Sequence, residues 1–224
     1  MIQGLGIKPR DISGYELVQS PKIDWDNDFV NDGRTYEYVY RAVPQEENGF
    51  TDVNESDYFY DAVVWAVENG ITNGKTETTF LPNEGCTRSQ IVTFLWRANG
   101  KPEPKLTENP FTDVSENAYY YKAVLWAVEN GITTGKTATT FLPNGNCTRA
   151  QAMTFFWRAE GKPEPKSTEC KFTDMSEDKF YYKAVLWAVE NGITTGKTAT
   201  TFAPDNNCTR SQIVTFLYRQ QNNL

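Results

Sequence analysis

Three arginines at equal spacing are the residues of this sequence best suited to hold an anion. Arg88, Arg149 and Arg210 each follow a threonine and lie 61 residues apart. Each is predicted at the first position of a helix, where unpaired backbone N–H groups and the positive end of the helix dipole favour negative charge. The planar guanidinium adds a fork of donors that matches a carboxylate. The same arginines could instead pair with a nearby aspartate or face solvent, so two interpretations stay open at this point.

The arginines belong to a sequence repeat that covers most of the chain. F-T-D motifs begin at Phe50, Phe111 and Phe172, and tryptophan, glycine and cysteine positions keep the same period of 61 residues. Such self-similarity is typical of a repeat architecture, in which each unit buries its apolar face against its neighbours. We therefore predict three related units with approximate threefold symmetry.

Each unit is predicted to contain two helices joined by a loop rich in turn residues. In the first unit an apolar face around Trp65 follows helical spacing, and Gly70 is expected to end this helix in a Schellman motif. Thr87 and Gln90 form a T-x-x-Q capping box for a second helix over residues 88–98. The second helix therefore begins at the arginine of the repeat.

An aspartate and an aromatic residue also recur at the start of each unit. The aspartate of the F-T-D motif can cap a turn through its carboxylate. The aromatic residue stands at the head of the predicted first helix, where it could pack in the core or lay its ring against a sugar. The aspartates are Asp52, Asp113 and Asp174, and the aromatic residues are Tyr58, Tyr119 and Phe180. Because Phe180 lacks a hydroxyl group, the third of these sites is expected to differ from the other two.

The composition excludes several kinds of chemistry. Among 224 residues 29 are acidic and 22 basic, and the net charge of −7 disfavours a sequence-independent hold on nucleic acid. Histidine is absent, which removes Ser-His-Asp and Cys-His nucleophile systems and histidine metal sites. No run of about 18 consecutive apolar residues is present, so we expect no insertion into a membrane. We predict neither an enzyme nor a cofactor, because no unique pair of carboxylates stands out for catalysis.

The four cysteines are not expected to bind a metal or to form a disulfide between equivalent positions. Cys86, Cys147 and Cys208 each precede the Thr-Arg pair of a repeat, and Cys170 lies alone in a linker. Equivalent positions around a threefold axis are not expected within the roughly 4.4–6.8 Å between Cα atoms that a disulfide requires. No C-x-x-C pair suggests zinc. The acidic run in residues 24–32 lacks the glycine and glutamate of a calcium-binding loop and is interpreted as a solvated loop.

The repeated motifs resemble those of the S-layer homology family. Three copies carry the F-T-D opening, an aromatic-led helix, a G-I-x-x-G turn, an F-x-P stretch and a T-R helix start. The family usually has tryptophan at the head of the first helix, where this sequence has tyrosine or phenylalanine. It usually has an acid after the T-R pair, where this sequence has Gln90, Gln151 and Gln212. These departures concern ligand chemistry rather than the fold.

The resemblance implies a mainly α-helical fold of three repeats, with the first helices gathered at the centre and with grooves between repeats. It implies that the three arginines help to hold a pyruvylated cell-wall sugar and that the three aspartates lie at the sugar-binding groove. Lys75, Lys136 and Lys197 follow the G-I-x-x-G turns and could add cations at the rim, although a solvated lysine is the simpler interpretation.

Residues 1–48 differ in character from the repeats. The stretches ISGYELV and TYEYVYRAV alternate apolar and polar residues, which predicts two antiparallel strands and part of a third. This segment resembles the end of a mucin-binding-type β repeat of bacterial surface proteins. We expect a β-rich segment at residues 1–48 and repeats at 49–110, 111–171 and 172–224, fused in the natural protein to an upstream exported part.

The resemblance and the repeat together predict a non-covalent anchor at the cell wall or S-layer surface of a Gram-positive-type bacterium. The expected partner is a secondary cell-wall polysaccharide. Its sugars either carry pyruvate groups or lack them, and both forms stay open. The alternative is a protein-interaction or spacer module that has lost glycan binding, because the family's usual tryptophan and glutamate are replaced.

Overall fold

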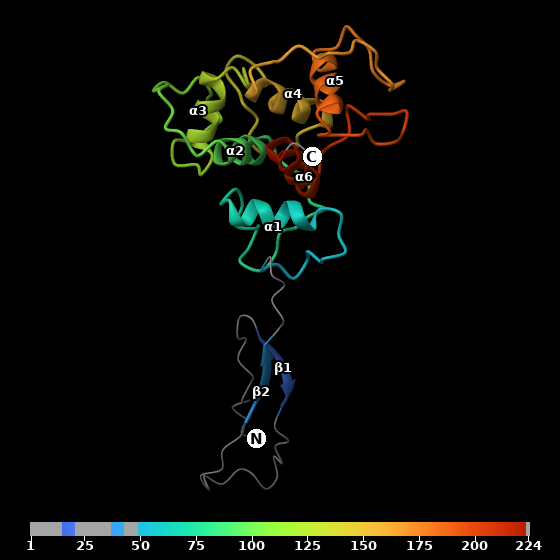
Figure 1. Ribbon diagram of the computed structural model, residues 1–224. Helices are drawn as coiled ribbons and strands as arrows, with labels where there is room; N and C mark the ends of the chain where they lie inside the picture. The colour runs from blue at the N-terminus through green and yellow to red at the C-terminus, as the bar shows by residue number, and fades with distance from the viewer. Residues whose placement is uncertain (1–14, 21–36, 43–48, 223–224) are drawn as a thin grey trace, which may run out of the picture. The chain divides into compact units, whose positions relative to one another are not determined.

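The computed structural model describes residues 15–20, 37–42 and 49–222 (Figure 1). The chain divides into two units, Met1–Glu46 and Glu47–Leu224. In the first, β1 (Tyr15–Gln19) and β2 (Val39–Ala42) pair antiparallel, which confirms the predicted pair of strands. The predicted part of a third strand and the acidic run lie outside the described residues.

Each repeat contributes two helices to the second unit, as the sequence predicts. The helices are α1 (Tyr60–Glu68) and α2 (Arg88–Ala98) in the first repeat, α3 (Tyr121–Glu129) and α4 (Arg149–Ala159) in the second, and α5 (Tyr182–Glu190) and α6 (Arg210–Asn222) in the third. The first helix of each repeat begins two residues after the predicted aromatic head, because a turn precedes it. In the first repeat the N–H of Tyr60 closes this turn on the carbonyl of Asp57 at 3.0 Å.

The predicted helix ends are confirmed. Gly70 has φ of +63°, and the N–H groups of Gly70 and Ile71 donate back to the last turn of α1 at 2.9 and 2.8 Å. This pair of bonds is a Schellman motif, and glycine fits it because the left-handed backbone brings no clash with a Cβ atom. At the start of α2, Thr87 Oγ1 accepts from the N–H of Gln90, and Gln90 Oε1 accepts from the N–H of Thr87. The capping box therefore fixes where the arginine of each repeat stands.

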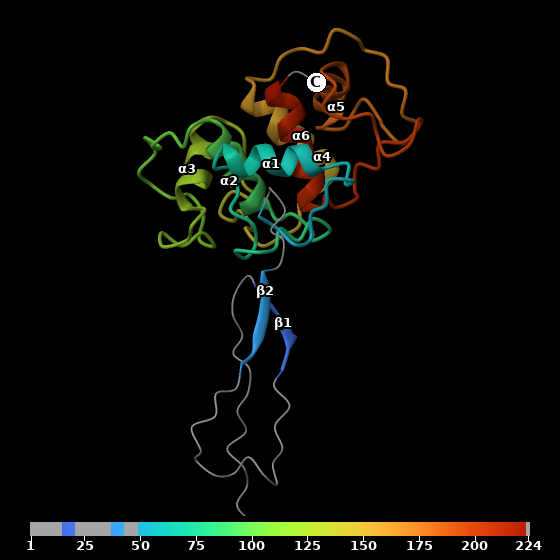
Figure 2. The ribbon, with the colours of Figure 1, turned by 60° about the horizontal axis from the view of Figure 1, so that its bottom comes forward.

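The second helices, not the first, gather at the centre of this unit. In Figure 1, α2, α4 and α6 lie inside, whereas α3 packs on α2, α5 on α4 and α1 on α6. The implied central position of the first helices is therefore wrong. The second helices also bury polar side chains whose hydrogen bonds are made inside the body: α2 buries seven of its eleven residues, among them Arg88 and Thr93, whereas α1 buries three of its nine. Figure 2 shows α1 beside α6, and the rings of Trp65 and Tyr218 meet there at 5.5 Å between centroids, so the third repeat closes on the first.

The three equivalent cysteines meet where the repeats come together. The N–H of Cys86 donates to the carbonyl of Cys208, that of Cys208 to Cys147, and that of Cys147 to Cys86, at 2.8–2.9 Å. The expectation that these positions stay far apart is wrong, because their backbones form a closed ring of hydrogen bonds. The side chains are fully buried, and Sγ of Cys86 and Cys147 donates to the carbonyl of the following threonine. All four cysteines are free thiols in the structure.

Candidate functional site

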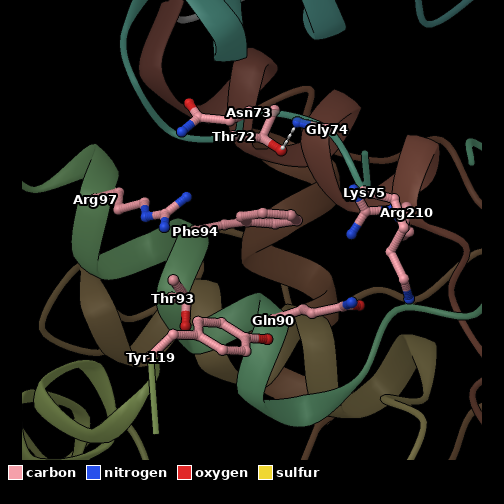
Figure 3. A pocket seen from close by; sticks show the side chains of 10 residues that line it. All are labelled: Thr72, Asn73, Gly74, Lys75, Gln90, Thr93, Phe94, Arg97, Tyr119 and Arg210. Atoms are coloured by element: carbon pink, nitrogen blue, oxygen red, sulfur yellow. Dashed lines mark hydrogen bonds between the residues drawn. The ribbon is translucent and has the colours of Figure 1, made fainter. Parts of the chain in front are cut away.

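Two related grooves, A and B, lie on this body, and each takes residues from all three repeats. Groove A is lined by the residues 72–75 loop and by α2 of the first repeat, by Tyr119 of the second and by Arg210 of the third. Figure 3 shows Tyr119 and Gln90 on one side of it, with Lys75 and Arg210 together at one end. Its volume is about 330 Å³. This is room for a small polar ligand.

Groove B repeats this arrangement one unit further on. It is lined by the residues 133–136 loop, by α4, by Phe180 and by Arg88, with a volume of about 230 Å³. By the period of the repeat, the residues equivalent to these in the third unit are those of α6 with Tyr58 and Arg149, and we refer to this set of residues as groove C. There the guanidinium of Arg149 lies 5.7 Å from the ring centroid of Phe216, as that of Arg88 lies 5.3 Å from Phe155.

The arginines enter the grooves from the starts of the central helices. Nε of Arg88 donates to the carbonyl of Phe141 at 2.8 Å, and the equivalent bonds join Arg149 to Phe202 and Arg210 to Phe80. Each guanidinium also lies 4.7–4.8 Å from the ring centroid of the same phenylalanine. These contacts hold the guanidinium in one orientation.

Each of these arginines keeps one buried nitrogen without a partner. The side chains are 2–4% exposed, and Nη2 of Arg88, Arg149 and Arg210 makes no hydrogen bond within the described residues. Burial lowers the pKa of all three guanidinium groups. An arginine nevertheless stays protonated in proteins, so the unpaired N–H groups carry positive charge. A buried donor left unpaired is costly, and an incoming acceptor removes that cost.

The aspartates of the F-T-D motifs act on the backbone beside the arginines. Oδ1 and Oδ2 of Asp52 accept from the N–H groups of Phe80 and Leu81 at 2.8 Å. Leu81 has φ of +56°, so the carboxylate holds a turn that L residues rarely adopt. Asp113 and Asp174 make the same pairs of bonds. Since the carbonyl of Phe80 accepts from Arg210, the aspartate positions the acceptor that orients the arginine.

The aromatic residues ahead of the first helices are exposed at the grooves. Tyr58, Tyr119 and Phe180 are 62–68% exposed, and Tyr119 lines groove A while Phe180 lines groove B. Each ring stands edge-on against the next residue in the chain, at 5.0–5.1 Å between centroids. The neighbours Phe59 and Tyr181 take the buried places. These aromatic side chains therefore belong to the surface, not to the core.

A second arginine lines each described groove and was not singled out from the sequence. Arg97 lines groove A, and its Nη1 donates to the carbonyl of Ile71 at 2.9 Å. Arg158 lines groove B, and its Nη1 donates to the carbonyl of Ile132 at 3.2 Å. The repeat could have indicated these arginines, because L-W-R-A at residues 95–98 and F-W-R-A at residues 156–159 are 61 residues apart. Lys75 also lines groove A, where a solvated lysine was the simpler expectation.

The family model of the S-layer homology domain matches residues 49–92, 110–153 and 171–214. The chain belongs to the S-layer homology family. Its place is accordingly the cell wall or cell surface. Among the helices that the structure describes, none has the length and apolar character needed to cross a membrane. The described side chains also form no cluster of three or more cysteine, aspartate or glutamate residues that could hold a metal ion.

Similar proteins are much longer than this chain. An endoglucanase of Bacillus sp. strain KSM-635 is 32% identical over 168 residues, which are 73% of this chain and 18% of that protein. The surface-layer 125 kDa protein of Lysinibacillus sphaericus is 33% identical over 70% of this chain and 13% of its own length. An amylopullulanase of Thermoanaerobacterium thermosulfurigenes is 27% identical over 88% of this chain and 11% of its own length. The chain thus spans less than a fifth of these relatives.

Proposed function

We propose that this S-layer homology module anchors a larger exported protein by binding an acidic secondary cell-wall polysaccharide in its grooves. The observation that carries the proposal is the unpaired, buried Nη2 of Arg88, Arg149 and Arg210. A carboxylate, such as that of a pyruvate ketal on a sugar, supplies the acceptor that each of these nitrogens lacks. A single ligand class then explains the same feature in all three repeats.

The rest of each groove suits a sugar. The exposed rings of Tyr119 and Phe180 offer flat apolar faces for a pyranose ring, while Gln90 and Thr93 in groove A offer polar contacts. Gln90 stands where the family usually has an acid. A neutral side chain at this position does not offset the positive charge of Arg210 in the same groove. Three grooves on one body also allow a polymer to be held at several points, which raises the overall affinity.

We further propose that the module itself is not an enzyme. Both oxygens of each F-T-D aspartate accept hydrogen bonds from backbone N–H groups, so these carboxylates serve the fold. A glycosidase needs two carboxylates free to act on either side of a bond. The names of the endoglucanase and amylopullulanase relatives describe proteins of which this chain matches a small part.

Sedimentation with cell-wall sacculi tests the anchor proposal. The chain is expected to pellet with sacculi that carry their wall polysaccharide and to stay in solution with acid-stripped sacculi. Arg88→Lys, Arg149→Lys and Arg210→Lys keep the charge but remove the fork, and each competent groove should lose about tenfold or more in affinity. Lys183→Gln is the matched control, because Lys183 pairs with the exposed Glu164 rather than lining groove A or B.

The same experiment separates the anchor from a protein-interaction or spacer module. The protein is tested on sacculi from Lysinibacillus sphaericus and Thermoanaerobacterium thermosulfurigenes, with circular dichroism to show that it is folded. Equal pelleting with intact and stripped sacculi, or none with either, would contradict glycan binding and favour the interaction module.

A further inference from the structure

The three grooves differ in charge at one position of the repeat. The residue two places before the ring cysteine is Glu84 in the first repeat, Gly145 in the second and Asn206 in the third. The loop that carries it touches the start of a central helix in every case. The carbonyl of Glu84 accepts from the N–H of Arg210 at 2.9 Å, and the carbonyl of Asn206 accepts from that of Arg149 at 2.8 Å.

In groove A the carboxylate of this residue is paired with a cation of the groove. Oε2 of Glu84 lies 2.8 Å from Nζ of Lys75, and both side chains are 41% exposed. Lys75 and Arg210 line the same end of the groove (Figure 3). Glu84 also acts on the arginine, because its negative charge opposes the lowering of the pKa of Arg210 by burial. One carboxylate therefore compensates part of the positive charge at that end.

Grooves B and C lack such a carboxylate. The equivalent lysines are Lys136 and Lys197, and neither has an ion-pair partner in the part of the chain that the structure describes. Asp205 is the acid closest in sequence to Asn206, but it does not pair with Lys197 and does not shift the pKa of Arg149. Neither groove A nor groove B has an acid among its lining residues, so the two differ in the carboxylate of Glu84, which reaches groove A through its ion pair with Lys75.

We propose that Glu84 makes groove A a weak site for carboxylate-bearing sugars and leaves grooves B and C as the anion-binding grooves of this chain. This inference rests on the function proposed above and names the residue that ranks the three sites. An additional negative charge roughly 5–10 Å from a bound carboxylate, in a groove open to solvent, weakens its binding about three- to tenfold. Glu84 is thus a specificity-determining residue.

An NMR titration measures the three grooves separately in one protein. The amide groups of Gly74, Gly135 and Gly196 report on one groove each, because they lie in the loops beside the grooves and donate to the equivalent threonines Thr72, Thr133 and Thr194. The probe is the methyl glycoside of a hexosamine that carries a pyruvate ketal. We expect the Gly135 and Gly196 signals to shift at about three- to tenfold lower probe concentration than the Gly74 signal.

Two exchanges at the equivalent position test the cause. Glu84→Gln should bring the affinity reported by Gly74 to that reported by Gly135. Asn206→Glu introduces a carboxylate opposite Lys197 and should weaken groove C by the same three- to tenfold factor. Glu77→Gln is the matched control, since Glu77 is exposed and forms no ion pair with Lys75, yet its exchange changes the net charge equally.

The outcomes distinguish the inference from the function on which it rests. Equal affinities in the three grooves of the natural chain, or a Glu84→Gln variant without effect on Gly74, would overturn the role of Glu84 while glycan binding stands. No shift in any of the three glycines at millimolar probe would contradict the proposed ligand class itself. The methyl ester of the probe, which carries no charge, should bind grooves A, B and C without the difference.

Discussion

The F-T-D aspartates show how a residue outside the groove lining acts on the groove. Asp113 holds the N–H groups of Phe141 and Leu142, and the carbonyl of Phe141 accepts from Nε of Arg88. The carboxylate therefore fixes the turn that orients the guanidinium. The sequence left a turn cap and a sugar contact as equal interpretations, and the geometry of these bonds accounts for the turn cap.

Replacing Asp113 by alanine should destabilise the protein and loosen groove B. The change removes two charge-assisted hydrogen bonds and leaves the backbone with φ of +60° at Leu142 unsupported, so the free energy of unfolding should fall by about 3 kcal/mol. Urea unfolding followed by circular dichroism measures this. Asp61→Ala, on the exposed side of α1, is the control and should change it by less than about 0.5 kcal/mol. Equal stability of the two variants would show that the turn does not need Asp113.

The period of the sequence was enough to find the arginines but not their partners. Arg210 bonds to the carbonyl of Phe80, which is 130 residues earlier in the chain. No local pattern gives such a pairing, because it depends on the third repeat closing against the first. The exposure of Tyr58 was equally out of reach, since an aromatic residue at the head of an apolar face fits both a core and a surface position.

Among the elements of a repeat, the loop between the two helices contains two glycines that are required for different structural reasons. Gly131 has φ of +65° and space around the position of a Cβ atom. Gly135 has φ of +91°, and a Cβ atom there would lie 2.4 Å from the carbonyl oxygen of Thr137 and 2.5 Å from the ring of Phe111. The first glycine is needed for backbone conformation alone, whereas the second also lets the F-T-D phenylalanine pack under the groove.

Alanine substitution should separate the cost of a left-handed backbone from the cost of a clash with a Cβ atom. Gly131→Ala is expected to lower the free energy of unfolding by about 1 kcal/mol, the cost of a left-handed backbone for an L residue. Gly135→Ala should cost about 1–3 kcal/mol more, because the backbone at Thr137 and the ring of Phe111 must also move. Thermal unfolding measures both variants. A larger loss for Gly131→Ala would contradict the close approach of Thr137 and Phe111 to Gly135.

Local signals predicted the elements better than their arrangement. The capping boxes and the Schellman glycines are short-range patterns, and they located the helix ends correctly. Which helix lies at the centre depends on contacts between repeats, such as the bond from Nε of Arg88 to the carbonyl of Phe141, and no local pattern gives these. The resemblance therefore led to the wrong helices at the centre, although the number of helices was right.

At the scale of the whole molecule, the ring of cysteine backbones joins all three repeats at one point. Burial raises the pKa of the three thiols, to about 12 for Cys208. Cys170 lies outside the ring and is partly exposed. The ring thiols should accordingly be protonated and inaccessible as long as the three repeats stay together.

Thiol titration tests this closed arrangement. One thiol, that of Cys170, should react with Ellman's reagent in the native protein, and all four should react in denaturant. The Cys170→Ser variant should show no fast reaction. Fast reaction of a second thiol in the native state would mean that the repeats separate readily.

The same burial predicts a loss of stability at high pH. The folded chain keeps thiol protons that the unfolded chain releases above a pKa near 9.0, so the free energy of unfolding should fall as the pH rises from about 9 towards 12. Urea unfolding at a series of pH values measures this fall. Cys208→Ala should make it less steep, and an identical slope in the variant would argue against a contribution from this thiol.

Carboxylate binding by the grooves is tested most directly by observing the guanidinium groups of Arg88, Arg149 and Arg210 while a pyruvate-bearing wall glycan is added. NMR of nitrogen-labelled arginine follows their Nε and Nη signals. We expect the Nη signals of at least one of these arginines to shift and their protons to exchange more slowly with water, because Nη2 gains a carboxylate partner. Binding of the glycan to the folded protein with all three sets of signals unchanged would contradict a carboxylate contact with Nη2.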